Sequence, residues 1–325
     1  MLQFLLRRTF GAAVILILIS AFTFFIFFAV PQDPALLACG KNCTKPAIEI
    51  IHKNLGLDQS VHIQYWEFMK GIFVGRDFAV GHCNAPCFGV SFNNNQMVWD
   101  TIIDRFPMTL SLTVGGLAVF LTVGLGAGIV AARRKGTMID KTVSSVSLVL
   151  SSMQIYFLGP IVLGIFVYSS GWLDNPKYIP FTESPGAWFM GLLIPWCVMA
   201  AIFTAQYTRM SRSTLIEQLQ EEHVRTARAK GMSKNYVFYR YAWRGSLTPI
   251  VTILGMDLGA LFGGAIVTET TFSLAGIGRL AVQSVQNKDL PLTMGVMIFS
   301  AAFILLFNII VDAAYAYIDP RVRLS

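Results

Sequence analysis

The sequence is poor in charged residues. Only 13% of its 325 residues are Asp, Glu, Lys or Arg, whereas 54% are hydrophobic, and the mean hydropathy is +0.59. Soluble domains carry about a quarter charged residues, so this composition excludes an ordinary soluble domain. Several apolar runs reach the length of about 20 residues that a helix needs to cross a bilayer. Because helices satisfy their backbone hydrogen bonds within each segment, we predict an all-α polytopic membrane protein.

The sequence also lacks the motifs of catalysis and nucleotide binding. Its four histidines lie in predicted loops, and there is no H-E-x-x-H, G-x-S-x-G or G-x-x-x-x-G-K-[ST] pattern. We therefore expect a subunit that is not an enzyme and holds no cofactor or metal; ATP, if used, binds another chain. The basic residues responsible for the net charge of +7 lie next to the apolar segments and form no soluble basic face. This distribution argues against nucleic-acid binding.

About six spans organise the predicted chain. The first is longer than a signal-peptide core of about 7–15 residues and lacks a clear small-residue cleavage site, so we interpret it as uncleaved. Basic residues gather at alternate span ends, and the positive-inside rule then places both termini in the cytoplasm. The approximate limits of the spans are 9–30, 106–132, 142–170, 188–213, 246–270 and 292–317.

Three regions follow from these spans. Residues 1–30 form an N-terminal segment with the first span, 31–105 form an external loop subdomain, and 106–325 form a five-helix core that includes a cytoplasmic loop at 214–245. The sequence shows no internal repeat, low-complexity tract or second soluble domain.

The external region is predicted to contain two helices. One covers Pro46 to Asn54 with Thr44 as its cap, and the other lies near Ser60 to Val74. Aromatic residues of the second, among them Tyr65, suggest a face on the membrane or against the spans. A small solvated subdomain with its own core is an equal alternative.

Four of the five cysteines also lie in this external region, as Cys39, Cys43, Cys83 and Cys87. An oxidising outer compartment favours disulfides, and four cysteines allow three connectivities. Pairing between the two C-x3-C clusters would close longer loops and constrain the unfolded chain more. A zinc site with His82 and free thiols are the less favoured alternatives.

The fifth predicted span carries both small and charged residues. Gly255, Gly259 and Gly263 recur at intervals of four, which predicts close helix packing; a sliding face is the functional alternative. Asp257 lies well inside this span, where an ionisable group is costly, and is our candidate pathway residue. Hydrogen bonding between helices, or a place in the wall of a wet cavity, is the plainer interpretation of Asp257 and of Glu269, near the outer end.

A long basic loop, from Glu221 to Thr252, separates the fourth and fifth spans. Glu217 to Lys230 contains good helix formers, Gly231 can end that helix in a left-handed conformation, and Ser233 can cap the next one. Two short helices joined at an elbow can insert into the groove of a partner. A solvated amphipathic loop is the plainer alternative.

Within this loop, Arg225-Thr-Ala-Arg-Ala-Lys-Gly231 resembles the coupling loop of binding-protein-dependent ABC importer permeases. This stretch is most similar in sequence to the dipeptide/oligopeptide/nickel group. The large first external loop resembles that of the B-type subunit of the group. Three further stretches are similar to the same group: Asp33-Pro34, Gly263-Gly-Ala-Ile-Val-Thr-Glu269 and the terminal Asp319-Pro-Arg-Val-Arg323. Arg225 and Thr226 depart from the general motif, which has Glu and Ala there, and Gln154 stands where relatives often carry Pro.

The resemblance implies a permease subunit of an ATP-driven importer in a prokaryotic cell membrane. Its partners would be a second permease, expected to be a different chain, two cytoplasmic ATPase subunits that bind ATP and Mg²⁺, and an external substrate-binding protein. Peptides are the expected substrate because of the large external loop; nickel or another small solute is the alternative, and a non-transporting scaffold is the rival class. ATPase docking is assigned to Arg225, Thr226, Ala227, Arg228, Lys230 and Gly231.

Overall fold

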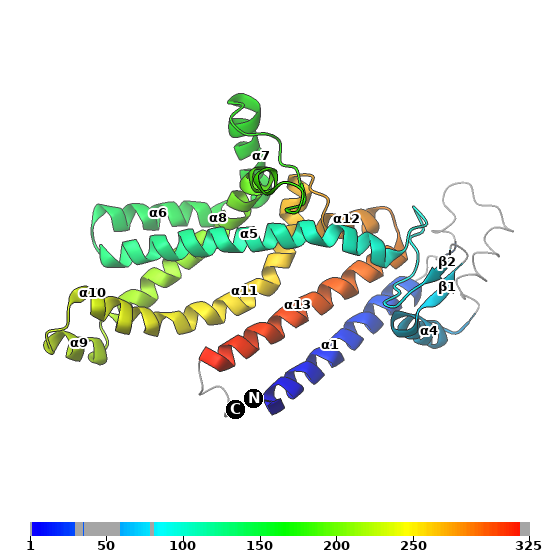
Figure 1. The fold of residues 1–325 in the computed structure, drawn as a ribbon, viewed down its shortest axis with the longest axis horizontal. Helices are drawn as coiled ribbons and strands as arrows, with labels where there is room; N and C mark the ends of the chain where they lie inside the picture. Colours follow the sequence, from blue (N-terminus) through cyan, green and yellow to red (C-terminus); the bar gives the residue numbers. More distant parts are fainter. Residues whose placement is uncertain (1, 30–34, 36–58, 79–80, 319–325) are drawn as a thin grey trace. The chain divides into compact units, whose positions relative to one another are not determined.

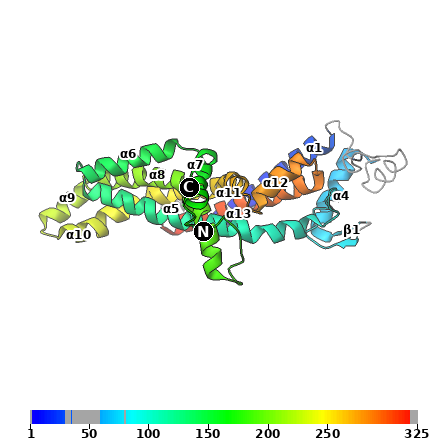
Figure 2. The same ribbon diagram turned by 90° about the horizontal axis from the view of Figure 1, so that it is seen from above.

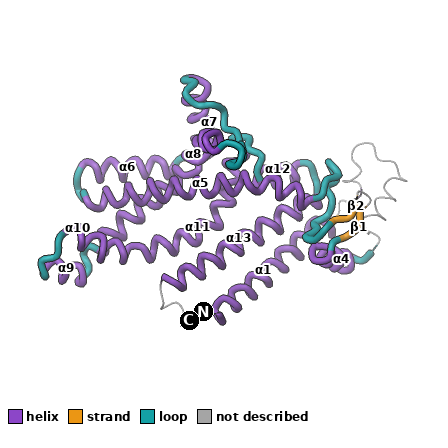
Figure 3. The backbone as a smooth tube through the Cα atoms, in the orientation of Figure 1, coloured by secondary structure: helices purple, strands orange, loops and turns teal. Residues whose placement is uncertain are grey.

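The computed structural model describes residues 2–29, 35, 59–78 and 81–318 and is mainly helical (Figures 1 and 3). The all-α prediction needs one correction, an antiparallel pair of short strands, β1 (Arg76–Phe78) and β2 (Gly81–Cys83). A cross-strand contact between Asp77 and His82 and a disulfide at the end of β2 support this pairing.

Helices make up most of the described residues. They are α1 (Leu2–Ala29), α4 (Val61–Val74), α5 (Val98–Arg133), α6 (Met138–Ser152), α7 (Ile155–Leu163), η1 (π-helix, Gly164–Ser169), α8 (Pro185–Gln218), α9 (Glu222–Ala229), α10 (Lys234–Val237), η2 (π-helix, Phe238–Ala242), α11 (Trp243–Thr271), α12 (Ile277–Gln286) and α13 (Leu290–Ile318).

Four of these helices are long and apolar enough to cross a membrane. They coincide with the first, second, fourth and sixth predicted spans, and are Leu6–Ile26 within α1, α5, α8 and Leu290–Val311 within α13. The third predicted span is a bent pair, α6 followed by α7 and η1, with an angle of 104° at the break. Met153 and Gln154 have extended backbone there, so the chain bends without a proline at 154. The fifth predicted span corresponds to α11, which is not among the candidates, and six spans stay a prediction.

The chain forms two compact units. One contains residues 108–274 and the chain from 310 onwards, and the other contains 2–107 and 275–309. The first unit has its core between α5, α8 and α11, where Phe120, Met199 and Leu261 are fully buried. The core of the second unit includes Ile102 from the start of α5, Leu280 of α12 and Val296 of α13.

Within the first unit, small residues bring α5 against α8. A side chain at Gly128 would overlap Ser211, and one at Gly124 would lie 3.0 Å from Cβ of Tyr207. The Thr208 hydroxyl donates to the Gly124 carbonyl at 3.2 Å. Such contacts matter in a bilayer, because packing and hydrogen bonds replace the hydrophobic drive between helices. On α11, Gly255 faces Val311 of α13 and Gly259 is half-buried, whereas the surroundings of Gly263 lie outside the described residues.

In the second unit, α4 packs on α1. It matches the predicted helix near Ser60 to Val74, with Ser60 at its N-cap and Gly75 at its C-cap. The Tyr65 hydroxyl lies 2.8 Å from Oγ of Ser20, and the Tyr65 and Phe68 rings contact Phe24. This helix therefore lies against the first span through one face.

The structure assigns one of the predicted disulfides. Cys83 and Cys87 are joined within their own cluster, so the cross-cluster pairing, which the loop-length argument favoured, does not involve these two. Cys39, Cys43 and the predicted helix at Pro46 to Asn54 with Thr44 lie outside the described residues.

Candidate functional site

The basic loop begins with a turn that the sequence did not predict. We expected one helix over Glu217 to Lys230, but α8 ends at Gln218 and α9 begins at Glu222. Leu219 in the turn packs against two small clusters at once, one with Leu215 and Phe238 and one with Val224 and Val237. The turn is followed by burial of Val224 in a cluster that includes Val237 of α10.

Gly231 ends α9 as predicted. Its φ is +79°, in the left-handed region, its N–H donates to the Arg228 carbonyl at 3.0 Å, and the Met232 N–H donates to the Ala227 carbonyl at 3.3 Å. These two bonds form a Schellman motif, and Met232 packs against the small apolar cluster that contains Ala227. The angle between α9 and α10 is thus set by backbone hydrogen bonds at one glycine.

Ser233 caps the next helix, also as predicted. Its hydroxyl accepts from the Tyr236 N–H at 3.4 Å. The helical path then runs from Lys234 through η2 into α11 without interruption up to Thr271. The elbow around Gly231 is therefore attached directly to a long helix of the core, and α9 and α10 lie together at one end of the first unit in both views (Figures 1 and 2).

The loop presents a positively charged surface. Arg225, Thr226, Arg228, Lys230 and Gly231 are exposed, and we call these five residues the coupling surface. Ala227, which the sequence analysis grouped with them, is only 4% exposed and packs between Val224 and Val237. Its small side chain fits the space between α9 and α10, so Ala227 packs beneath the exposed residues and is not part of the coupling surface.

Two contacts beside the coupling surface were not anticipated. The Arg133 guanidinium, at the end of α5, lies 4.3 Å from the Phe238 ring centroid and 4.8 Å from that of Tyr239. Stacking of this kind attracts a cation to the face of the ring. The basic residues near 133 predicted only the orientation of the chain. Their spacing does not indicate an aromatic partner about a hundred residues away.

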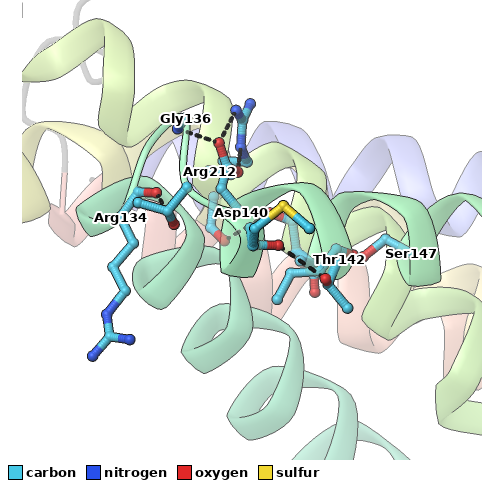
Figure 4. A network of polar contacts seen from close by, with 11 residues as sticks. Arg134, Gly136, Asp140, Thr142, Ser147 and Arg212 are labelled. Atoms are coloured by element: carbon cyan, nitrogen blue, oxygen red, sulfur yellow. Dashed lines mark hydrogen bonds and ion pairs between the residues drawn. The ribbon is translucent and has the colours of Figure 1, made fainter.

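The second contact is a buried ion pair, shown in Figure 4. Asp140 of α6 is 4% exposed and accepts from Nε and Nη2 of Arg212 on α8, the latter at 2.8 Å. The Gly136 N–H, in the turn between α5 and α6, donates to the same carboxylate at 2.9 Å. The pair fixes the α5–α6 turn to α8 two turns before α8 ends at the basic loop.

The predicted charged residues inside α11 both have hydroxyl partners. The Tyr207 hydroxyl of α8 donates to Oδ2 of Asp257 at 3.0 Å, and the Thr109 hydroxyl of α5 donates to Oε1 of Glu269 at 2.6 Å. Glu269 is fully buried and Asp257 is half-buried. Among the described residues, no three His, Cys, Asp or Glu side chains gather as a metal site would require.

Known protein families match both parts of the chain. Residues 1–113 match the N-terminal region of the membrane components of binding-protein-dependent transport systems, and residues 124–324 match the family of binding-protein-dependent transport system inner membrane components. Together the two matches cover nearly the whole chain.

Similar proteins extend over the same length. A putative peptide transport system permease protein of Brucella abortus is 32% identical over 99% of both chains, as is the glutathione transport system permease protein GsiC of Escherichia coli K12. Among solved structures, the inward-facing MetNI methionine ABC transporter aligns with a TM-score of 0.50 at 16% identity, over 68% of this chain and 94% of the other. That likeness shows the fold alone. The resemblance inferred from the coupling loop is confirmed: this chain belongs to the family of binding-protein-dependent transport system inner membrane components.

Proposed function

We propose that the chain is a permease subunit of an ATP-driven importer of peptides. The proposal is supported by its family and by full-length relatives named for peptide and glutathione transport, glutathione being itself a tripeptide. The protein would cross a prokaryotic cell membrane several times, with both termini in the cytoplasm, and would enclose a pathway together with a second permease chain. An external binding protein would deliver the peptide.

Energy would reach this chain through the coupling surface. Two cytoplasmic ATPase subunits, which bind ATP and Mg²⁺, would dock on Arg225, Arg228 and Lys230 and on the exposed backbone at Gly231. The observation that supports this proposal is the continuous helical path of the region. The elbow at Gly231 leads through α10 and η2 directly into α11. A displacement of α9 by the ATPase would be transmitted to a core helix without an intervening flexible link.

The experiment that tests this coupling uses Gly231. No atom lies within 4 Å of where a Cβ would be, so a side chain at this position is opposed by the left-handed backbone and meets no steric clash. Gly231→Leu should therefore favour an altered elbow, because left-handed backbone costs about 1–2 kcal/mol for an ordinary residue. We expect unchanged insertion and at least a tenfold loss of peptide uptake and of peptide-stimulated ATP hydrolysis in proteoliposomes.

Gly231→Asn is the matched control, since Asn tolerates the left-handed region better than other side chains. It should keep most of the transport activity although it also adds a polar side chain to the coupling surface. Normal uptake by the Leu variant would contradict the proposed coupling. Stimulation of the wild type by Ni²⁺ and by no peptide would retain the importer but replace its substrate.

A further inference from the structure

The Tyr207–Asp257 pair joins α8 to α11, which correspond to the fourth and fifth predicted spans. Tyr207 is fully buried, its ring centroid lies 5.0 Å from that of Phe120, and Gly124 leaves room for its Cβ. The hydroxyl is consequently fixed in position, and it donates to Oδ2 of Asp257 at 3.0 Å. One oxygen of the carboxylate is thus held by a rigid donor from the neighbouring helix.

The other oxygen has no such partner. Within the described part of the chain, the Tyr207 hydroxyl is the one hydrogen-bond donor to the Asp257 carboxylate, and Asp257 is only half-buried. Asp257 also borders an exposed strip of α11 that includes Thr252 and Met256, the latter 65% exposed. A carboxylate facing lipid hydrocarbon is very costly, and ionisable groups in spans face a water-filled cavity or the interior of an assembly. The strip therefore faces a water-filled cavity or the interior of the assembly, and a transport pathway is a cavity of this kind.

A carboxylate at this position can only accept hydrogen bonds, so its ligand must be a donor and is best a cation. We propose that Asp257, oriented by Tyr207, is a transient binding site for the N-terminal ammonium group of a passing peptide. This inference rests on the proposed function. Peptides differ in their side chains but share this group, and a charge-assisted hydrogen bond to it would serve any sequence.

Nickel is a poorer ligand for the same site. Imidazole nitrogen suits this metal, whereas the site offers a single carboxylate with a tyrosine, and the described residues contain no three-ligand cluster. The main rival is a contact between Asp257 and the second permease, which would make the carboxylate a part of the assembly.

The experiment compares four forms of the complete complex in proteoliposomes: wild type, Asp257→Asn, Asp257→Glu and Tyr207→Phe. Uptake of trialanine is compared with that of N-acetyl-trialanine, each well above its measured Kd for the binding protein. Because a hydrogen bond to a charged group is lost, we expect Asp257→Asn to slow trialanine uptake about tenfold and the acetylated peptide little. Asp257→Glu should restore most of the uptake, and Tyr207→Phe, which keeps the buried ring, should reduce it about threefold.

A second measurement reports on the site directly. Met256→Cys in a Cys197→Ser background places a thiol beside Asp257, and the Cys197→Ser parent gives the background labelling. Modification by a small water-soluble reagent should be fast and should be slowed by trialanine. The protection should disappear when Asp257→Asn is added.

Each other result has a distinct meaning. Equal slowing of both peptides by Asp257→Asn, or a thiol at 256 that water-soluble reagents never reach, would assign Asp257 to an interface and overturn the inference. Unchanged trialanine uptake by Asp257→Asn would do the same. If the wild-type complex carries neither peptide, the proposed function itself fails, and this inference with it.

Discussion

At the scale of single residues, the Asp140–Arg212 pair illustrates how a membrane protein fixes a turn. Asp140 is almost completely buried, whereas the Arg212 side chain is 30% exposed. Both Nε and Nη2 of Arg212 donate to the carboxylate, and the Gly136 N–H adds a third bond. The planar guanidinium can make this two-point contact, but a lysine ammonium acts as a single point charge.

We therefore predict that Arg212→Lys destabilises the protein although it preserves the charge. The loss should be about 1–3 kcal/mol, because one hydrogen bond to a charged group disappears. It should appear as a lower unfolding temperature in detergent, measured by size-exclusion chromatography after heating. Asp140→Asn should show a similar loss, and the double variant Asp140→Asn/Arg212→Gln should lose less than the sum of its single changes. Additive losses would show that the two side chains do not interact.

Residues whose conformation depends on their neighbours in sequence were predictable. Gly231 and Ser233 were predicted from local patterns, since a helix end is decided by the few residues around it. The partners of Asp140 and of Asp257 were not, because each lies on a different helix and no pattern along the chain identifies it. The interruption of the helix at Leu219 was not predicted for the same reason, because Leu219 packs against Phe238, which lies further along the chain.

At the scale of elements, α5 and α8 approach through glycine, and this contact was not anticipated either. The glycines of α11 recur at a regular interval of four, and α5 contains a similar pair at Gly124 and Gly128. The two face α8, while Gly126 between them points to open space with no atom within 4 Å of its Cβ position. The facing direction follows from tertiary packing and cannot be read from the spacing alone.

This asymmetry gives a matched pair of substitutions two residues apart, on different faces of α5. Gly128→Leu should push α5 away from Ser211 and Thr208, and overpacking of this kind costs about 1–3 kcal/mol. We expect it to reduce the yield of monodisperse protein and its unfolding temperature, whereas Gly126→Leu should leave both near the wild-type values. Equal effects of the two substitutions would show that the loss comes from helix propensity or bulk and not from the α5–α8 contact.

At the scale of the whole molecule, the number of membrane crossings depends on the bent pair of helices. Four helices are candidates by themselves, and the bent pair of α6 with α7 and η1 is either one broken span or a re-entrant loop. The two possibilities differ in parity. A crossing puts the segments before and after the pair on opposite sides, whereas a re-entrant loop returns them to the same side.

Each of the five connections between the six predicted spans contains an exposed lysine. Labelling at these positions shows on which side of the membrane each connection lies. They are Lys70, Lys135, Lys177, Lys230 and Lys288. Each can be changed to cysteine in a Cys197→Ser background and treated in intact spheroplasts with a membrane-impermeant maleimide, with lysed cells as the control for reactivity. Because basic residues concentrate on the cytoplasmic side, we expect labelling of 70, 177 and 288 from outside and of 135 and 230 only after lysis. If the bent pair does not cross, 177 will be protected with 135, and 230 will react in intact cells. That result would contradict the six-span prediction and remove the coupling surface from the side where ATP is available.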